Sequence, residues 1–479
     1  MISLRSIPGL NLAAGLFAGS RPVNPPIQRA NPSKGYRFVT RVKRSKNRQD
    51  LVILAFSGGG TRAAAFSYGV LEALRKIEIV SSKGKRIRIL DEVDLITGVS
   101  GGSFTALAYA LYGEKLFDIY ETSFLKRDVQ GELIGRVLSP ASWTAWGRSE
   151  TAAQLYDDIL FHGATFADLD RRKGPFVIAT ATDISTGARL GFHQGVFDFL
   201  CSDLNAVPLS RAAAASSAVP FAFSPVTLNN YGGTCHYKLP PFLSAYSDPA
   251  TASRPAARVL SHLRDLQSYE DSAHRPFVHL LDGGLSDNLG MRGVLEVLED
   301  IEALACLGRP SPLDGVKRII IFVVNSRSSP QTDWDASEYP PNELELLIKA
   351  TGVPIDHYSY DTVETLRDTL ARWQNMRKLR ESSAFAGNKD PAVAQLLRTP
   401  DKDLYVIDVS FAALSNKAER DYLNNLPTSF NLPPKAVDRL RAAAGAIIRN
   451  SRDFKRLMSE AGAKIVKRSS DRRRRKRVR

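Results

Sequence analysis

The clearest pattern along the chain is a short apolar run that ends in glycines and is followed by a helical pattern. Residues Leu51–Phe56 (LVILAF) precede three glycines, and Val93–Thr97 (VDLIT) precede a second glycine-rich turn. Continuous apolar runs of this length are typical of strands buried on both faces. Helices are predicted after each turn, over Thr61–Ile77 and Phe104–Tyr112. This repeated order predicts an α/β fold with a mostly parallel central sheet covered by helices on both faces.

Similar patterns continue toward the C-terminus. Further strands are predicted at Phe176–Thr182, Phe277–Leu281, Ile319–Val324 and Leu404–Val409, and further helices at Pro434–Asn450 and Arg452–Ala461. The segment Tyr237–Ser272 has no clear period, and we interpret it as a surface excursion or a lid. The sequence contains no apolar stretch of about 18 residues, so no helix is expected to span a membrane.

One candidate for chemistry is Ser100, which stands in the pattern Gly98-x-Ser100-x-Gly102 after the second strand. A serine on a sharp strand-to-helix turn is lifted out of the sheet, and its neighbours must be small because the backbone bends tightly there. The N-terminus of the following helix also favours negative charge at this place. The pattern alone also arises by chance, so its position between strand and helix carries the interpretation.

A second candidate is the loop Gly58-Gly59-Gly60 at the end of the first strand. Acyl transfer builds negative charge on a carbonyl oxygen, and a glycine loop can turn its backbone N–H groups toward that charge. A phosphate loop would need a following Gly-Lys-Ser/Thr, and a dinucleotide loop would need GxGxxG; the sequence has neither. A tight turn without a ligand remains the alternative.

A third candidate is Asp282, which begins Asp-Gly-Gly after the strand Phe277–Leu281. A carboxylate at the carboxyl end of a strand can reach a ligand crevice, although Asp-Gly is also a common turn dipeptide. Only His357 follows Asp282 in the sequence, and His279, three residues before Asp282, should face the other side of the strand. A Ser–Asp dyad needs no histidine, because the carboxylate takes the hydroxyl proton itself.

Four blocks, in this order, resemble the patatin-like phospholipase family, and together they cover about half of the chain. Ser57–Arg62 (SGGGTR) resembles the oxyanion loop of that family, and Gly98–Gly102 (GVSGG) its nucleophile turn. Ala214–Val226 (AASSAVPFAFSPV) resembles its third block, and Asp282–Gly284 (DGG) the motif of its dyad aspartate. Ala63 departs from the glycine that many members carry there.

The resemblance implies a lipid acyl hydrolase that cleaves acyl esters of membrane lipids, including phospholipids, without a metal or cofactor. It implies that Ser100 is the nucleophile, that Asp282 is its base, and that the amides of Gly58, Gly59 and Gly60 form the oxyanion hole. The alternative is a lipid-binding or scaffolding protein that retains the fold without turnover.

The cysteines and the N-terminus bear on the cellular compartment. No cysteine or histidine cluster has zinc spacing, and Cys201 and Cys235 could form a disulfide in an oxidising compartment. The apolar run Leu10–Phe17 resembles a weak bacterial secretory or lipoprotein signal, with Ser20 where a lipoprotein would carry cysteine. We expect a bacterial cell-envelope protein, periplasmic or membrane-associated, with the cytoplasm as the alternative.

We divide the chain into five parts. They are a leader or signal at 1–20, a Pro-rich and basic linker at 21–50, a patatin-like catalytic domain at 51–302, an α/β and helical continuation at 303–462, and a basic tail at 463–479.

Most of the net charge of +15 belongs to the tail, where Lys464–Arg479 contains ten Lys or Arg residues and one Asp. Such runs are usually solvated and disordered, but they also bind anionic lipid headgroups or nucleic acid. The rest of the chain shows no nucleic-acid recognition motif, so an anionic membrane surface is the favoured partner. The oligomeric state is not indicated by the sequence.

We predict that deletion of Arg472–Arg479 lowers activity on anionic vesicles at low salt and leaves turnover of a soluble short-chain ester unchanged. Each cation near an anionic surface contributes about 1 kcal/mol, and salt screens it. Vesicle assays at increasing salt measure this. An equal loss on the soluble ester would instead make the tail part of the folded enzyme, and no loss on either would make it a solvated tail.

Overall fold

The structure is a computed structural model. It describes residues 22–38, 40, 49–80, 84, 86–138, 147–220, 222–239, 257–306, 308–311, 313–329, 332, 334–385, 387, 390–462 and 464–465. The expected leader at 1–20 and nearly all of the basic tail lie outside these described residues. Among the described helices, none offers the apolar length that a bilayer crossing would need.

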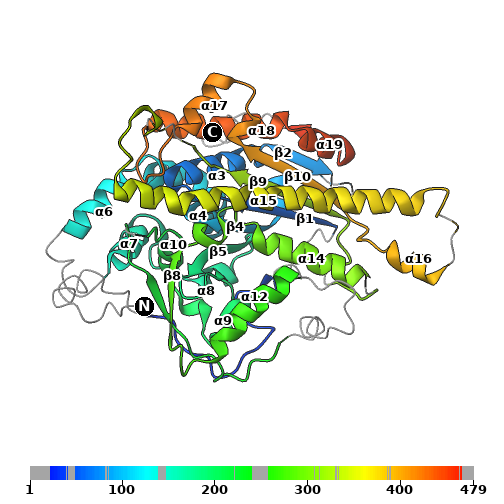
Figure 1. The fold of residues 1–479 in the computed structure, drawn as a ribbon, viewed down its shortest axis with the longest axis horizontal. Helices are drawn as coiled ribbons and strands as arrows, with labels where there is room; N and C mark the ends of the chain where they lie inside the picture. The colour runs from blue at the N-terminus through cyan, green and yellow to red at the C-terminus, as the bar shows by residue number, and fades with distance from the viewer. Residues whose placement is uncertain are drawn as a thin grey trace, which may run out of the picture.

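A twisted sheet in the order β10-β9-β1-β4-β5-β8-β7 forms the centre of the molecule, with β6 paired to β5 (Figure 1). Five neighbouring strands are parallel: β1 (Asp50–Phe56), β4 (Val93–Val99), β5 (Phe176–Asp183), β9 (Arg318–Asn325) and β10 (Asp403–Ser410). Three antiparallel strands complete it: β6 (Arg189–Gly191), β7 (Val226–Asn229) and β8 (Phe277–Asp282). The predicted α/β class with a mostly parallel sheet is confirmed.

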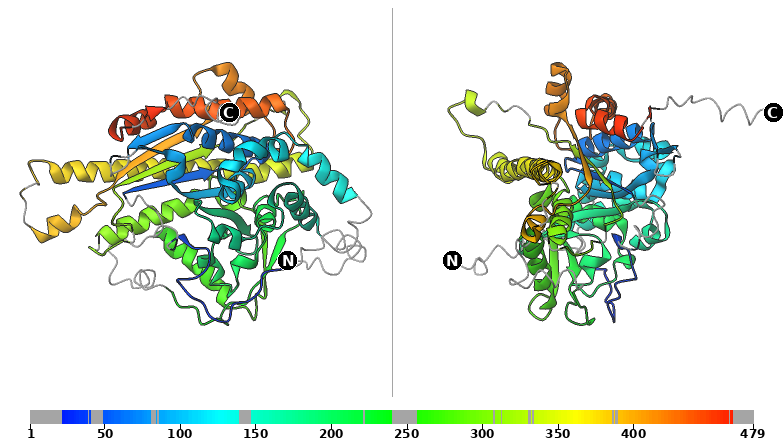
Figure 2. Two further views of the ribbon diagram at one scale, coloured as in Figure 1. Left: turned by 180° about the vertical axis from the view of Figure 1, so that it is seen from behind. Right: turned by 90° about the vertical axis from the view of Figure 1, so that its right-hand side faces the viewer.

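Helices cover both faces of this sheet, which explains why its central strands β1 and β9 are apolar without alternation. On one face, α3 (Gly60–Leu74) packs against α18 (Pro434–Asn450), beside α4 (Gly101–Tyr112) and α19 (Arg452–Glu460). The opposite face carries α15 (Glu343–Glu381), as the right-hand view of Figure 2 shows. All seven residues of β1 are buried between these layers.

The remaining described helices lie around the sheet and its two covering layers. They are α5 (Leu116–Tyr120), α6 (Val129–Leu138), α7 (Arg148–Tyr156), α8 (Phe166–Arg171), α9 (Gln194–Phe197), α10 (Leu209–Ser216), α12 (Ala257–Gln267), α13 (Gly284–Asp287), α14 (Arg292–Cys306), α16 (Pro391–Leu396) and α17 (Lys417–Asn424).

Two predicted elements differ from the structure. The helix expected to reach Ile77 ends at Leu74, and Ile77 begins the strand β2 (Ile77–Val80). In β2 the residues alternate between buried and half-buried, a strand period, and β2 pairs with β3 (Arg86–Arg88) and β11 (Lys464–Ile465). Within Tyr237–Ser272, where no element was expected, α12 forms and packs against α14.

The long helix α15 was not predicted at all. It has 39 residues and contains Pro354, which normally ends or bends a helix. Among the side chains that the structure describes in α15, few apolar ones are buried, and Leu366 and Trp373 are two of them. Contact with the sheet and with α13 therefore supports a helix whose sequence signal is weak.

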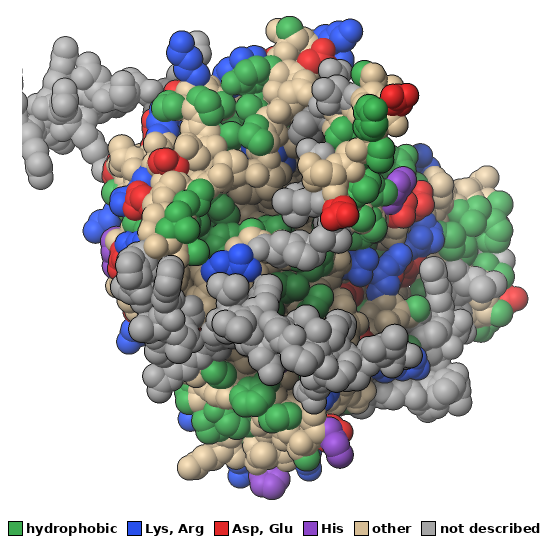
Figure 3. Space-filling model, turned by 60° about the vertical axis from the view of Figure 1, so that its left-hand side comes forward, with side chains coloured by type: hydrophobic (Ala, Val, Ile, Leu, Met, Phe, Trp, Pro, Cys, Tyr) green, Lys and Arg blue, Asp and Glu red, His purple; other side chains and the backbone are tan. Residues whose placement is uncertain are grey.

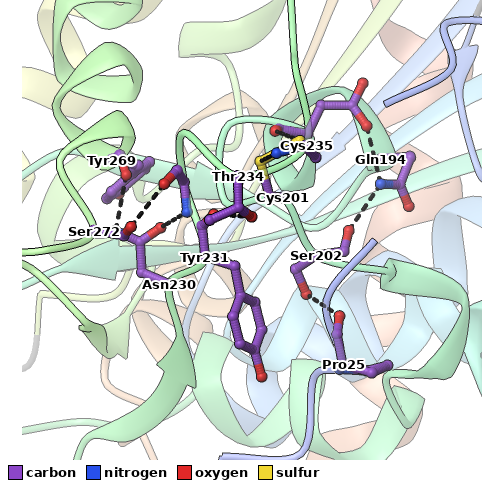
Figure 4. Close-up of a disulfide and its surroundings, with 12 residues drawn as sticks. Pro25, Gln194, Cys201, Ser202, Asn230, Tyr231, Thr234, Cys235, Tyr269 and Ser272 are labelled. Carbon is purple, nitrogen blue, oxygen red and sulfur yellow. Dashed lines mark hydrogen bonds between the residues drawn. A yellow bond between two sulfur atoms is a disulfide. The ribbon is translucent and has the colours of Figure 1, made fainter. Parts of the chain in front are cut away.

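A disulfide joins Cys201 to Cys235, with the Cα atoms 5.4 Å apart (Figure 4). The N-terminal segment is attached to the same region. The amide of Ile27 donates to the Cys201 carbonyl oxygen at 2.8 Å, and the amide of Ala30 donates to the Cys235 carbonyl oxygen at 3.0 Å. Part of the segment assigned to a linker therefore packs on the domain, and Tyr36 in it is fully buried.

We predict that replacing Cys201 and Cys235 together by Ser lowers the free energy of unfolding by roughly 3–4 kcal/mol, because the disulfide closes a long loop and restricts the unfolded chain. Urea denaturation measures the change. Cys306→Ser is the matched control, because Cys306 is a half-buried thiol outside the disulfide. A reductant that leaves the wild-type transition unchanged would contradict the prediction.

Candidate active site

Ser100 occupies a strained turn between β4 and α4. Its backbone has φ 47° and ψ −122°, a left-handed conformation that residues other than glycine rarely adopt. The side chain lies near the edge of the sheet, and the residue is 6% exposed. Strain of this kind persists only where the surrounding structure holds it, and it is concentrated at functional sites.

The glycines around Ser100 are required by close backbone contacts. A Cβ atom on Gly101 would lie 1.9 Å from the carbonyl oxygen of Gly60, and one on Gly102 would lie 2.6 Å from the carbonyl oxygen of Ser57. The serine turn therefore packs directly against the backbone of the glycine loop that follows β1. Any side chain at these positions would push the two loops apart.

The three amides of the glycine loop, all expected to be oxyanion donors, differ in their hydrogen bonding. The amide of Gly58 donates to the carbonyl oxygen of Asn288 at 3.0 Å, so it is already committed. The amides of Gly59 and Gly60 donate to no acceptor within the described residues. Both residues have positive φ angles, 136° and 59°, which glycine adopts without strain and which turn these amides out of the β1 ladder. The expected oxyanion role of Gly58 therefore stays a prediction, and its amide would have to leave Asn288 to fulfil it.

Asp282 comes to Ser100 by a route that the sequence did not predict. The strand β8 runs antiparallel to β5 and overlaps only its last residues, with Asp282 opposite Ala181. The chain therefore enters from beyond the carboxyl edge of the parallel strands and ends beside Ser100. The conclusion that Asp282 lies at this edge holds, although the strand direction is opposite to that of β5.

Burial and hydrogen bonding set the charge state of Asp282. Burial raises the pKa of its carboxyl from the usual 3.8 to about 6, and hydrogen bonds from the Gly284 amide and from the Ser100 side chain oppose this shift. The Gly284 amide lies 2.7 Å from Oδ1. The carboxyl thus lies beside the candidate nucleophile and has a pKa near neutrality, as a proton acceptor requires.

The third block, Ala214–Val226, to which the sequence assigned no role, forms hydrogen bonds with the backbone at both Ser100 and Asp282. The Ser100 amide donates to Oγ of Ser216 at 2.9 Å. The Gly283 amide donates to the Ser216 carbonyl oxygen at 3.1 Å, and the Asp282 amide donates to the Ala218 carbonyl oxygen at 2.9 Å. The end of α10 therefore fixes the backbone on each side of the Ser100–Asp282 pair.

Sequence reasoning missed three further residues at this site. Arg62 is buried and ties the start of α3 to the end of β9 through the Ser326 carbonyl oxygen at 2.8 Å. Asn288 holds Gly58 through its carbonyl oxygen, and its Oδ1 would lie 2.6 Å from a Cβ on Gly58. Tyr358 of α15 donates to the Gly284 carbonyl oxygen. The pattern carried one signal for these contacts, the position of Arg62 in the glycine motif.

The histidines considered from the sequence lie away from the pair. His279 is exposed, and its Nδ1 lies 3.0 Å from Oγ1 of Thr227. His357 is exposed on α15. Within the described residues, no hydrogen bond joins a histidine to Ser100 or Asp282. The described residues contain no group of three or more His, Cys, Asp or Glu side chains that could hold a metal ion.

Fold and site together define an α/β protein that carries a serine on the kind of strand-to-helix turn that hydrolases use. The sequence profile of the patatin-like phospholipase family matches residues 54–295, about half of the chain, and the chain belongs to that family.

Individual relatives are more distant. A cGAMP-activated phospholipase of Escherichia coli (strain TW11681) is 27% identical over 244 residues, which are 48% of this chain and 61% of the relative. Human GIVD cytosolic phospholipase A2 aligns with a TM-score of 0.44 and 12% identity, covering 91% of this chain and 72% of that one. Its complex with methyl gamma-linolenyl fluorophosphonate aligns with a TM-score of 0.41 and 14% identity, covering 92% and 70%.

We predict that Asp282→Asn stabilises the fold at pH 7 by up to about 3 kcal/mol. A carboxyl whose folded pKa exceeds its unfolded value binds more protons when folded, so its contribution to stability falls as pH rises from about 4 to about 6. The neutral amide does not incur this loss. Denaturation at pH 4 and pH 7 measures the gain, which should disappear at pH 4; an equal effect at both pH values would contradict the prediction.

Proposed function

We propose that the protein is a lipid acyl hydrolase, a phospholipase A-type serine esterase that uses a Ser100–Asp282 dyad. One observation carries this proposal: the buried carboxyl group of Asp282, with its pKa raised to about 6, lies beside the side chain of Ser100. Membership of the patatin-like phospholipase family supports the same activity.

In the proposed reaction, Asp282 accepts the hydroxyl proton while Oγ of Ser100 attacks the ester carbonyl carbon. The negative oxygen of the tetrahedral intermediate then lies toward the amides of Gly59 and Gly60, at the N-terminus of α3. The intermediate collapses to an acyl-enzyme, and the alcohol leaves with the proton from Asp282. Water repeats the sequence: Asp282 takes its proton, the acid is released, and Ser100 recovers its hydrogen.

We propose a membrane lipid, and phospholipid in particular, as the substrate. The relative from Escherichia coli is described as a phospholipase. Hydrophobic side chains are spread over the face that contains α6 and the first half of α15 (Figure 3). Among them, Ile134 and Leu138 of α6 and Leu346 and Val353 of α15 are at least 41% exposed. Exposed apolar groups on one face suit contact with a lipid surface.

We also propose a bacterial cell-envelope location with contact to anionic membranes through the basic tail. The disulfide between Cys201 and Cys235 suits an oxidising compartment. The signal-like residues at 1–20 and the tail after Ile465 lie outside the described residues, so these two features rest on the sequence alone.

We predict that Ser100→Ala abolishes ester hydrolysis with the fold intact, and that Asp282→Asn is nearly as damaging, by at least about 1000-fold in kcat. The two losses should not add, since paired groups act as a unit. Rates on short-chain esters and phospholipids measure the losses, and a fluorophosphonate probe should label Ser100.

Two histidine variants are the matched controls. His279→Ala and His357→Ala should retain most activity, because neither side chain contacts the pair. A hundredfold loss in either variant would replace the dyad by a triad. A wild-type protein that turns over none of these esters and is not labelled at Ser100 would favour the alternative, a lipid-binding or scaffolding protein.

A further inference from the structure

The hydroxyl of Ser216 is the acceptor for the backbone amide of the strained Ser100. β4 pairs with β5 as far as Val99, where the register ends. Beyond it, the Ser100 amide turns away from the ladder and donates to Oγ of Ser216 at 2.9 Å. Ser216 is the last residue of α10 and is fully buried. Both residues are buried, so loss of this bond would leave the Ser100 amide without its acceptor inside the fold.

The carbonyl oxygen of Ser100 is fixed on the opposite side. The amide and the hydroxyl of Ser103 both donate to it, at 2.9 Å and 2.6 Å. These two bonds lie within the first turn of α4 and form wherever that helix forms. The bond to Ser216, in contrast, comes from a different part of the chain, and it links the turn to α10.

Those surroundings include the aspartate. The backbone of Ser216 accepts the Gly283 amide at 3.1 Å, so one residue bonds to Ser100 through its side chain and to the neighbour of Asp282 through its main chain. Ala218, two residues later, accepts the amide of Asp282 itself. Ser216 and Ala218 thus bond to the backbones of both Ser100 and Asp282, so this short segment determines the distance between the two residues.

We propose that Ser216 is a positioning residue for the dyad, whose hydroxyl holds the strained Ser100 turn beside Asp282. This inference rests on the proposed function. Ser216 takes no part in bond making. It acts by keeping Oγ of Ser100 aligned with its base, and small misplacements of reacting groups reduce rates by up to about 100-fold.

The proposal has two measurable consequences. Ser216→Ala should lower kcat on a soluble short-chain ester by about 10- to 100-fold with KM nearly unchanged, because substrate contacts remain. It should also move the acidic limb of the pH–rate profile to higher pH. The hydrogen bond from Ser100 lowers the pKa of Asp282, so a weaker bond lets that pKa rise.

The neighbouring residue supplies a matched control. Ser217 is equally small and buried, and its hydroxyl donates to the Ala213 carbonyl oxygen at 2.8 Å rather than to the pair. Ser217→Ala removes the same atoms one position away, so it reports any general loosening of the end of α10. It should leave kcat within a few-fold of wild type and the acidic limb in place.

Ser216→Cys gives a second test, which remains available if Ser216→Ala does not fold. Sulfur is a weak acceptor of nearly the same shape, so kcat and the acidic limb should fall between those of wild type and Ser216→Ala. A Ser216→Ala variant that matches Ser217→Ala in kcat and in pH profile would overturn the inference. If the alanine variant does not fold, a Ser216→Cys variant whose acidic limb of the pH–rate profile matches that of the wild type would also overturn the inference.

Failure of the proposed function is distinguishable, because it appears in the wild type. The rate at which a fluorophosphonate probe labels Ser100 should fall in Ser216→Ala in parallel with kcat. A wild-type protein that is neither labelled nor active would reject the dyad itself. A labelled and active wild type with an unaffected Ser216→Ala variant would reject only the positioning role.

Discussion

The site depends on the direct contact of two backbones, the serine turn after β4 and the glycine loop after β1. Because a Cβ on Gly101 would lie 1.9 Å from the Gly60 carbonyl oxygen, the two turns meet without any intervening side chain. This closeness brings Ser100 beside the amides of Gly59 and Gly60. It also requires parallel neighbouring strands, since only then do both turns lie at the same edge of the sheet.

Asp282 reaches the carboxyl edge of the parallel strands at the end of β8, which runs in the opposite direction to them. Strand β8 is antiparallel, and the end of α10 bonds to the backbones of Ser100, Asp282 and Gly283. The strained conformation of Ser100 and the burial of Asp282 both cost stability, and the surrounding hydrogen bonds maintain them. In a site of this kind, the preorganised arrangement of the Ser100 and Asp282 side chains lowers the stability of the fold.

Outer elements reinforce the same loops from distant parts of the sequence. Arg62 ties the glycine loop to the end of β9, and Tyr358 of α15 bonds to the loop after Asp282. The residues after position 302 therefore complete the site rather than form a separate appendage. Only Arg62 has a local signal, its place in the glycine motif, because the partners of both side chains lie far away in the sequence.

The sequence by itself determined the α/β class, the glycine-flanked Ser100, the motif of Asp282 and the strands of the central sheet other than the short β6 and β7. These follow from continuous apolar runs and from turns that only small residues can form. Tertiary structure alone decided the direction of β8, the helix α15 and the commitment of the Gly58 amide to Asn288. Each of these rests on pairing between residues far apart in the chain, and local periodicity contains no information about such partners.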